Sequence, residues 1–196
     1  GEMGSRGTPA IRLAEAEQAA RVLKLSHRSN LGFPDTQLVN TVEYRNRLAM
    51  EIRRLKPRTV IIPYWEARHP DHFHAGAIAF DASFLAGLRK LDETVPPHRP
   101  YKVIYSSLYA NVTPSFVVDI SAQFERRMES LFCYQSQYGR PDAASGLFPE
   151  MSEIRDRLAA LARFYGNLIG ARFGEPFVVK EAIRIDDVVA MPVRTF

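Results

Sequence analysis

The sequence predicts an α/β fold with a doubly wound, mostly parallel sheet. Short apolar runs rich in β-branched residues, typical of buried strands, alternate along the chain with longer segments of helical periodicity. This alternation favours parallel strands covered by helices on both faces. The chain has 196 residues, of which 46% are hydrophobic, enough for one domain with a real core. We therefore expect residues 1–196 to form a single domain.

The first half of the chain carries clear start and stop signals. Thr8 can cap a helix, and Pro9 suits a first helical position because its missing N–H would have no partner there. Lys56-Pro57 ends a second helix, since the residue before a proline avoids helical conformation. The expected elements are helices at 9–24, 41–55 and 75–91 and strands at 27–32 and 59–64.

The second half continues the alternation after a proline-rich linker at residues 92–100. A stripe of Phe124, Met128, Leu131 and Phe132 indicates the buried face of a helix. The expected elements are strands at 101–109, 115–121 and 177–185, helices at 122–137 and 152–170, and a loop at 139–149.

Composition excludes several classes of function. The chain has 26 basic and 22 acidic residues, and the excess is spread out, so no nucleic-acid partner is expected. Cys133 is the single cysteine, which rules out an internal disulfide and fits a reducing, cytoplasmic compartment. No apolar run is long enough for a membrane span, and no signal-peptide pattern opens the chain, so no membrane partner is expected.

The side chains suited to catalysis or metal binding are concentrated between the strand expected at 59–64 and the helix expected at 75–91. Arg68, His69, Asp71 and His72 crowd together there, around a proline that suits the first helical turn. In open α/β sheets this rim is where ligands bind. Two histidines three residues apart share a helix face, and neutral imidazoles suit a divalent metal such as zinc. The alternative is a polar helix start with solvated histidines, because short motifs often match by accident.

Residues 68–72, Arg-His-Pro-Asp-His, resemble the second signature of the PIG-L/LmbE-like zinc N-deacetylases. The longer string at 62–72, together with Phe-Val-Val-Asp-Ile-Ser at 116–121, looks most like the bacillithiol-biosynthesis deacetylase branch, and Leu-Gly-Phe-Pro-Asp at 31–35 resembles the family's Leu-Gly-Leu-Pro-Asp. The resemblance implies a Rossmann-like fold and zinc-assisted hydrolysis of an acetamide. The implied substrate is an N-acetylglucosaminyl conjugate, and in the bacillithiol branch it is N-acetylglucosaminyl malate.

The same resemblance implies roles for individual residues. His72 would be a zinc ligand, and His69 would stabilise the oxyanion or protonate the leaving amine. Asp71 would orient an imidazole. Substrate-facing positions would be Arg68, Arg12, Asp35 and Glu2. Other interpretations stay open for two of these: Arg12 could pair only with Glu15 at the surface, and Asp35 could simply cap a turn.

Relatives carry a strand, an Ala-His-Pro-Asp-Asp loop, a helix and a second strand upstream of the region where this chain begins. The resemblance therefore implies an N-terminally truncated domain that lacks the first strand–helix–strand unit, and the chain by itself is expected to be inactive. A small-molecule substrate and a homo-oligomer are expected. Three alternatives remain: an inactive sugar-binding or regulatory module, a deacetylase of another N-acetyl sugar, and a nucleotide-binding protein with an accidental His-x-x-His. The last would need a glycine-rich first turn, which the sequence does not show.

Overall fold

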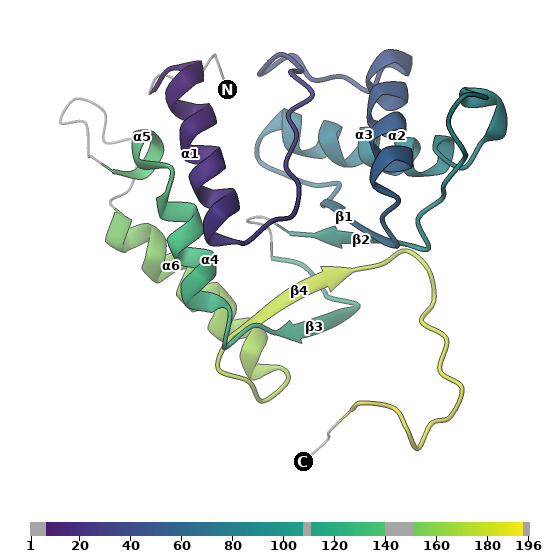
Figure 1. Cartoon of the computed structure of the whole chain (residues 1–196). Helices are drawn as coiled ribbons and strands as arrows, with labels where there is room; N and C mark the ends of the chain where they lie inside the picture. The colour runs from purple at the N-terminus through teal and green to yellow at the C-terminus, as the bar shows by residue number, and fades with distance from the viewer. Residues whose placement is uncertain (1–6, 108–110, 140–150, 194–196) are drawn as a thin grey trace.

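A computed structural model describes residues 7–107, 111–139 and 151–193. Figure 1 shows an α/β fold, which confirms the predicted class. Four strands form one sheet in the order β1-β2-β4-β3. Their bounds are β1 Thr59–Pro63, β2 Lys102–Ser106, β3 Phe116–Asp119 and β4 Gly174–Val178.

The sheet is mixed, so the expectation of a mostly parallel sheet is wrong for the described strands. β1 and β2 run parallel, with Thr59 opposite Lys102. β4 runs antiparallel to both β2 and β3. Alternation of strands and helices predicts crossovers, but it does not fix the direction in which a strand enters between two others. β1 lies at one edge of the described sheet with Ile61 58% exposed; that a further strand unit pairs beside it stays a prediction.

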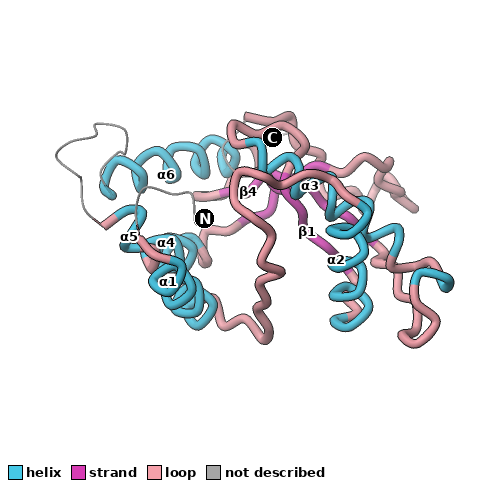
Figure 2. The backbone as a smooth tube through the Cα atoms, turned by 90° about the horizontal axis from the view of Figure 1, so that it is seen from above, coloured by secondary structure: helices cyan, strands magenta, loops and turns pink. Residues whose placement is uncertain are grey.

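The helices form two groups, as Figure 2 shows: α2 and α3 on one side of the strands, and α1, α4, α5 and α6 on the other. α3 packs on β1 and β2, and α6 packs on β4 and β3. None of the helices in the described ranges is long and apolar enough to cross a membrane. The bounds are α1 Pro9–Val22, α2 Val42–Leu55, α3 Pro70–Leu85, a 3₁₀ turn η1 Arg89–Leu91, α4 Phe124–Phe132, α5 Gln135–Tyr138 and α6 Met151–Asn167.

The core joins the two groups through the sheet. Ile62 and Tyr105 of the parallel pair pack in one buried cluster with Tyr165 of α6. The Tyr165 hydroxyl accepts a hydrogen bond from the Val112 amide at 2.9 Å and lies 2.8 Å from the side-chain oxygen of Asn111. A buried hydroxyl needs such partners, because an unpaired one would cost free energy. The expected Phe124 and Met128 core is confirmed in a second cluster between α4 and α6.

Two predicted strands differ from the structure. Residues 27–32 form no strand; instead Ser29 and His27 contact the Glu51 carboxylate of α2, at 2.6 and 3.2 Å. Hydrogen bonds to Arg54, then to Ser29 and His27, lower the pKa of Glu51 to about 2. The expected strand at 177–185 is β4, which begins at Gly174 and ends at Val178, because its ladder to β3 ends at Phe177 and its ladder to β2 ends at Val178. An apolar run with no strand beside it cannot form a ladder.

Arg53 of α2 is fully buried and holds the region that follows α3. Its guanidinium donates to the carbonyl oxygens of Ala86 at 3.0 Å, Asp92 at 2.6 Å and Val95 at 2.8 Å, and also to Leu88. Carbonyl groups at the end of a helix lack intrahelical donors, and Arg53 donates to two such groups, those of Ala86 after α3 and of Asp92 after η1. The buried charge is thereby surrounded by acceptors.

We expect Arg53→Met to lower the free energy of unfolding by about 3 kcal/mol or more, because a fully buried side chain would lose its hydrogen bonds and the carbonyl oxygens of Asp92 and Val95 would lose their donor. Urea unfolding followed by circular dichroism measures this. Arg126→Met, at an exposed position of α4, is the matched control and should change stability by no more than about 0.5 kcal/mol. Equal stability of the two variants would contradict the anchoring role of Arg53.

Candidate active site at the start of α3

The site is built where β1 ends and α3 begins. Gly76 of α3 faces the backbone at the end of β1: a Cβ added there would lie 2.5 Å from the carbonyl oxygen of Pro63. A real Cβ cannot come that close, so glycine is what allows the helix to approach the strand. The first turn of α3 is therefore held directly over the carboxyl end of β1, the predicted rim.

His69 is the N-cap of α3, and Pro70 lies in the first helical turn as predicted, although the helix spans Pro70–Leu85 and not the expected 75–91. The His69 Nδ1 accepts a hydrogen bond from the Asp71 amide at 3.2 Å, which satisfies one of the donors left open at a helix start. A ring nitrogen that accepts carries no proton. The neutral imidazole in this geometry therefore carries its proton on Nε2.

Asp71 reaches back to a loop far away in the sequence. Its carboxylate accepts hydrogen bonds from the Thr36 amide at 2.7 Å and from the Leu38 amide at 3.3 Å. Thr36 has a positive φ of 64°, an uncommon backbone conformation for a threonine, and Asp71 secures the turn in which it occurs. The preceding residue, Asp35, is brought to the start of α3 by this contact. Nothing in the sequence signalled that Asp71 would hold this loop.

Asp35, His69 and Asp71 each offer one ligand atom, and these atoms all lie within 4.8 Å of one another. His69 is exposed and the two carboxylates are half-buried. One imidazole and two carboxylates fit a divalent ion such as Zn²⁺. The carboxylate of Asp71 retains acceptor capacity beyond its two backbone contacts. The described residues at the start of α3 therefore fit a metal.

His72, the predicted zinc ligand, lies next to this group. Its ring centroid is 5.3 Å from that of His69. Burial lowers the pKa of His72, and the nearby His69 lowers it further, against a weaker opposite effect of Asp71. The imidazole is therefore kept neutral, the state in which histidine binds a metal. The sequence-based grouping of His69, Asp71 and His72 at one helix start is present in the structure.

The remaining predicted site residues are Arg68, Arg12 and Glu2. Arg68 is exposed in the loop before α3. Arg12 lies on α1, which packs on α4 and α5, and its buried Nε has no hydrogen-bond partner among the described residues. Glu15 accepts from the amide of Ser136 at 2.6 Å and from its hydroxyl at 2.7 Å, so this buried acid joins α1 to α5. Glu2 lies outside the described residues.

Comparison with known proteins identifies the family. The family model of PIG-L, GlcNAc-PI de-N-acetylase, matches residues 1–83, which include every predicted site residue. The conserved protein TT1542 from Thermus thermophilus is 38% identical, with a TM-score of 0.82 over 95% of this chain and 80% of that one. The chain belongs to the PIG-L family.

Two relatives within this family have a named activity. Diacetylchitobiose deacetylase from Thermococcus kodakarensis is 28% identical over 180 residues, which cover 89% of this chain and 64% of that protein. N,N'-diacetylchitobiose deacetylase from Pyrococcus horikoshii, solved with its inhibitor MPG, is 28% identical with a TM-score of 0.72, over 86% of this chain and 62% of that one. The chain thus spans less than two thirds of the length of these two relatives.

The narrower resemblance to the bacillithiol branch is not confirmed by these PIG-L relatives, which act on diacetylchitobiose. A hydratase from Pseudomonas putida KT2440, which acts on 4-carboxy-2-hydroxymuconate, is only 15% identical, yet aligns with a TM-score of 0.65 over 91% of this chain and 75% of that one. That likeness shows the fold alone. The chemistry must therefore be argued from the residues at the start of α3.

We expect Asp71→Ala to release the loop at residues 36–38, because the Thr36 and Leu38 amides would lose their acceptor. Hydrogen exchange measured by NMR should show a loss of protection at both amides. Asp81→Ala is the control on the same helix: it removes contacts to Asn40 and Arg45 instead. If both variants left the Thr36 and Leu38 amides equally protected, Asp71 would not be the anchor of the loop.

Proposed function

We propose that the protein is a metal-dependent amide hydrolase that removes the acetyl group from an N-acetylglucosaminyl compound. The observation that carries the proposal is the Arg-His-Pro-Asp-His segment at residues 68–72, folded as the first turn of α3 over the end of β1, with three metal-compatible side chains around it. Membership of a family whose relatives include named deacetylases supports it.

We assign the metal to His72 and not to His69, on hydrogen-bonding grounds. A neutral histidine binds a metal through an unprotonated nitrogen. The Nδ1 of His69 already accepts from the Asp71 amide, and its Nε2 carries the proton, so ligation by His69 would require giving up the helix cap. His72 has no such cap to lose, and its lowered pKa keeps the ring neutral. The ligand atoms of Asp35 and Asp71 lie within 4.8 Å of that of His69, and the His72 ring lies beside the His69 ring, so the two carboxylates would complete or orient a site at His72.

The side chains of this chain would then share the work of amide hydrolysis. A divalent metal bound here supplies Lewis-acid activation of the acetamide carbonyl and of the attacking water. In the reaction, water oxygen adds to the carbonyl carbon and the C–N bond breaks, releasing acetate and the free amine. The Nε2–H of His69 would donate to the developing oxyanion or to the leaving nitrogen. Asp71 fixes His69 through the helix start, and Arg68, exposed beside it, would meet an anionic substituent of the substrate.

Two N-acetylglucosaminyl compounds that differ in the group attached to the sugar are candidate substrates. N-acetylglucosaminyl malate, implied by the sequence resemblance, carries carboxylates that Arg68 and Arg12 suit. Diacetylchitobiose, on which the named relatives act, is uncharged. The cytoplasmic location expected from the sequence fits either compound. The alternative of an inactive sugar-binding module shares the fold, and it would bind the sugar without releasing acetate.

Acetate release distinguishes these possibilities. We expect the protein, expressed with whatever sequence precedes residue 1 in its reading frame and supplied with zinc, to release acetate from N-acetylglucosaminyl malate faster than from diacetylchitobiose. Arg68→Ala should abolish that preference by raising KM for the malate compound alone. Residues 1–196 on their own, with His72 as the only ligand matched to the family motif, should not turn over either compound. Binding of sugar with no acetate released from any N-acetyl sugar by the longer form would contradict the hydrolase.

Substitution of each histidine in turn should separate the effect on metal binding from the effect on the catalytic rate. In the protein expressed with the sequence that precedes residue 1, we expect His72→Ala to lose bound zinc, because affinity depends on the number of ligands, and His69→Ala to keep zinc while kcat falls by about 10²–10⁴-fold. Elemental analysis of the purified variants measures the first and initial rates measure the second. His74→Ala, on the same turn of α3, is the control and should retain both zinc and rate. Zinc lost from His69→Ala but kept by His72→Ala would reverse the assignment.

A further inference from the structure

Lys180 closely follows the end of β4, and its ammonium lies over three aromatic rings. The Nζ is 4.7 Å from the centroid of Phe80, 5.2 Å from that of Tyr105 and 5.2 Å from that of Trp65. These rings belong to α3, to β2 and to the loop that follows β1. Because the face of an aromatic ring attracts a cation, this one side chain links the end of β4 to three other parts of the fold.

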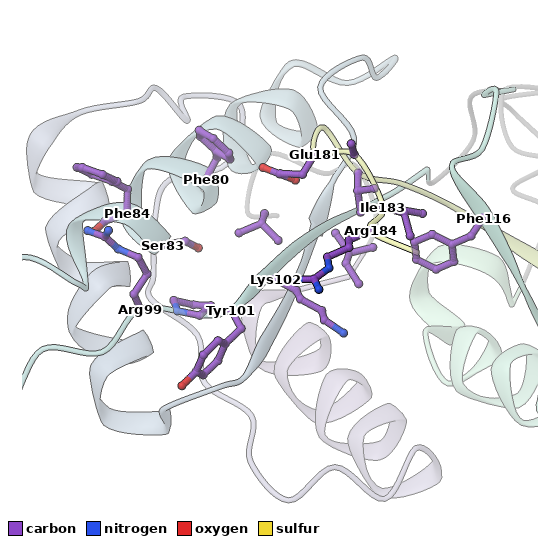
Figure 3. Close-up of a pocket in the computed structure, with 15 residues that line it drawn as sticks. Phe80, Ser83, Phe84, Arg99, Tyr101, Lys102, Phe116, Glu181, Ile183 and Arg184 are labelled. Carbon is purple, nitrogen blue, oxygen red and sulfur yellow. The ribbon is translucent and has the colours of Figure 1, made fainter. Parts of the chain in front are cut away.

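The three rings differ in how firmly the fold holds them. Tyr105 is buried within β2, whereas Phe80 is 37% and Trp65 38% exposed. Figure 3 shows Phe80 on α3 and Glu181, the residue after Lys180, along the same side of a groove of about 650 Å³ that both help to line. The helix fixes the backbone of Phe80, but Trp65 lies in neither a helix nor a strand. Trp65 is therefore the ring whose position depends most on its side-chain contacts, which are an edge-to-face contact with Tyr105 at 4.8 Å and the ammonium above it.

Trp65 begins the segment that leads from β1 to the candidate site. The Tyr64 amide donates to the Ser106 carbonyl oxygen at 3.0 Å and so extends the pairing of β1 with β2. Within the described parts of the chain, residues 65–68 then make no backbone hydrogen bond, and the next fixed point is the cap of α3 at His69. A segment with so few backbone hydrogen bonds opens at little cost in free energy. The placement of this segment therefore depends on its two ends, which are the Trp65 ring and the His69 cap.

A change at Trp65 would affect Arg68 and His69 to different degrees. His69 has a hydrogen bond of its own, because its Nδ1 accepts from the Asp71 amide at 3.2 Å. Arg68 is exposed and makes no hydrogen bond or ion pair with any residue in the described ranges. The position of its guanidinium therefore follows the position of the backbone that carries it. Loss of the contacts at Trp65 would displace Arg68 and leave the capped His69 in place.

We propose that Lys180 is a positioning residue of the site: it holds the Trp65 ring and thereby sets where Arg68 meets the substrate. The inference rests on the proposed function, in which Arg68 contacts an anionic substituent, and it adds a residue that touches neither the substrate nor a metal. Without the ammonium, the indole and residues 66–68 behind it would sample more positions. An anionic substrate would then bind more weakly, because the ordering of Arg68 would have to be supplied on binding.

Trp65 is the single tryptophan of the sequence, so the fluorescence of residues 1–196 reports on this contact without any measurement of activity. Lys180→Met removes the charge and keeps an apolar side chain, whereas Lys180→Arg keeps a cation that can lie over the rings. Lys90→Met, which removes one charge from an exposed position of η1, is the matched control. We expect the acrylamide quenching constant of Trp65 to rise and its fluorescence anisotropy to fall in Lys180→Met alone. Equal quenching in Lys180→Met and the parent chain overturns the proposal.

Steady-state kinetics of the protein expressed with the sequence that precedes residue 1 measure the consequence for the substrate. We expect Lys180→Met to raise KM for N-acetylglucosaminyl malate about two- to fivefold, the factor that the loss of one exposed cation–π contact gives, while kcat is retained. A variant that merely folded less well would instead lower kcat at constant KM, because fewer molecules would be active. Lys180→Arg should restore the parent KM. An unchanged KM in Lys180→Met overturns the proposal.

A double variant tests whether Lys180 acts through Arg68. In the Arg68→Ala background, Lys180→Met should leave KM for the malate compound unchanged, because the residue through which it acts is already gone. A further rise of KM in that background overturns the proposal. If even the parent protein released no acetate, the proposed function would fail by itself, and the quenching of Trp65 would still decide whether Lys180 holds the segment.

Discussion

The close approach of α3 to the end of β1 is the contact on which the site depends. At Gly76 there is no room for a side chain against the carbonyl of Pro63, so this single position sets the distance between helix and strand. With the helix seated there, His69 becomes its cap and Asp71 lies in its first turn. A helix start carries unpaired amide groups and a partial positive charge, which suits the carboxylates gathered around it.

Hydrogen bonds that maintain the fold also divide the chemistry between neighbouring residues. The Asp71 amide occupies one nitrogen of His69, and this leaves His69 as a donor through its other nitrogen. The Asp71 carboxylate is used at the same time to hold the Thr36 turn, which brings Asp35 to the helix. His72 is left as the neutral imidazole with no capping duty, because burial lowers its pKa. Two histidines three residues apart thus have different environments, and different environments are how one fold assigns different roles to like groups.

The fold by itself does not select this chemistry. A hydratase with 15% identity superposes on the chain with a TM-score of 0.65, whereas the deacetylase from Pyrococcus horikoshii reaches 0.72 at 28% identity. The same sheet and helices can therefore carry unrelated reactions, which is expected of a widely used architecture.

The sequence by itself determined the structural features that depend on residues close together in the chain. The helix starts at Thr8-Pro9, Thr41 and Pro70 and the strand at residues 59–63 follow from capping and from local apolar patterns, and the structure has them within a few residues. The motif at 68–72 is likewise a run of consecutive residues, so the sequence alone shows it. The tertiary structure alone decided the antiparallel direction of β4, its end at Val178, the bond of Glu15 to Ser136 and the anchoring of Thr36 by Asp71. Each of these joins segments far apart in the chain, and no local propensity records which distant partner will supply a hydrogen bond or where its ladder will end.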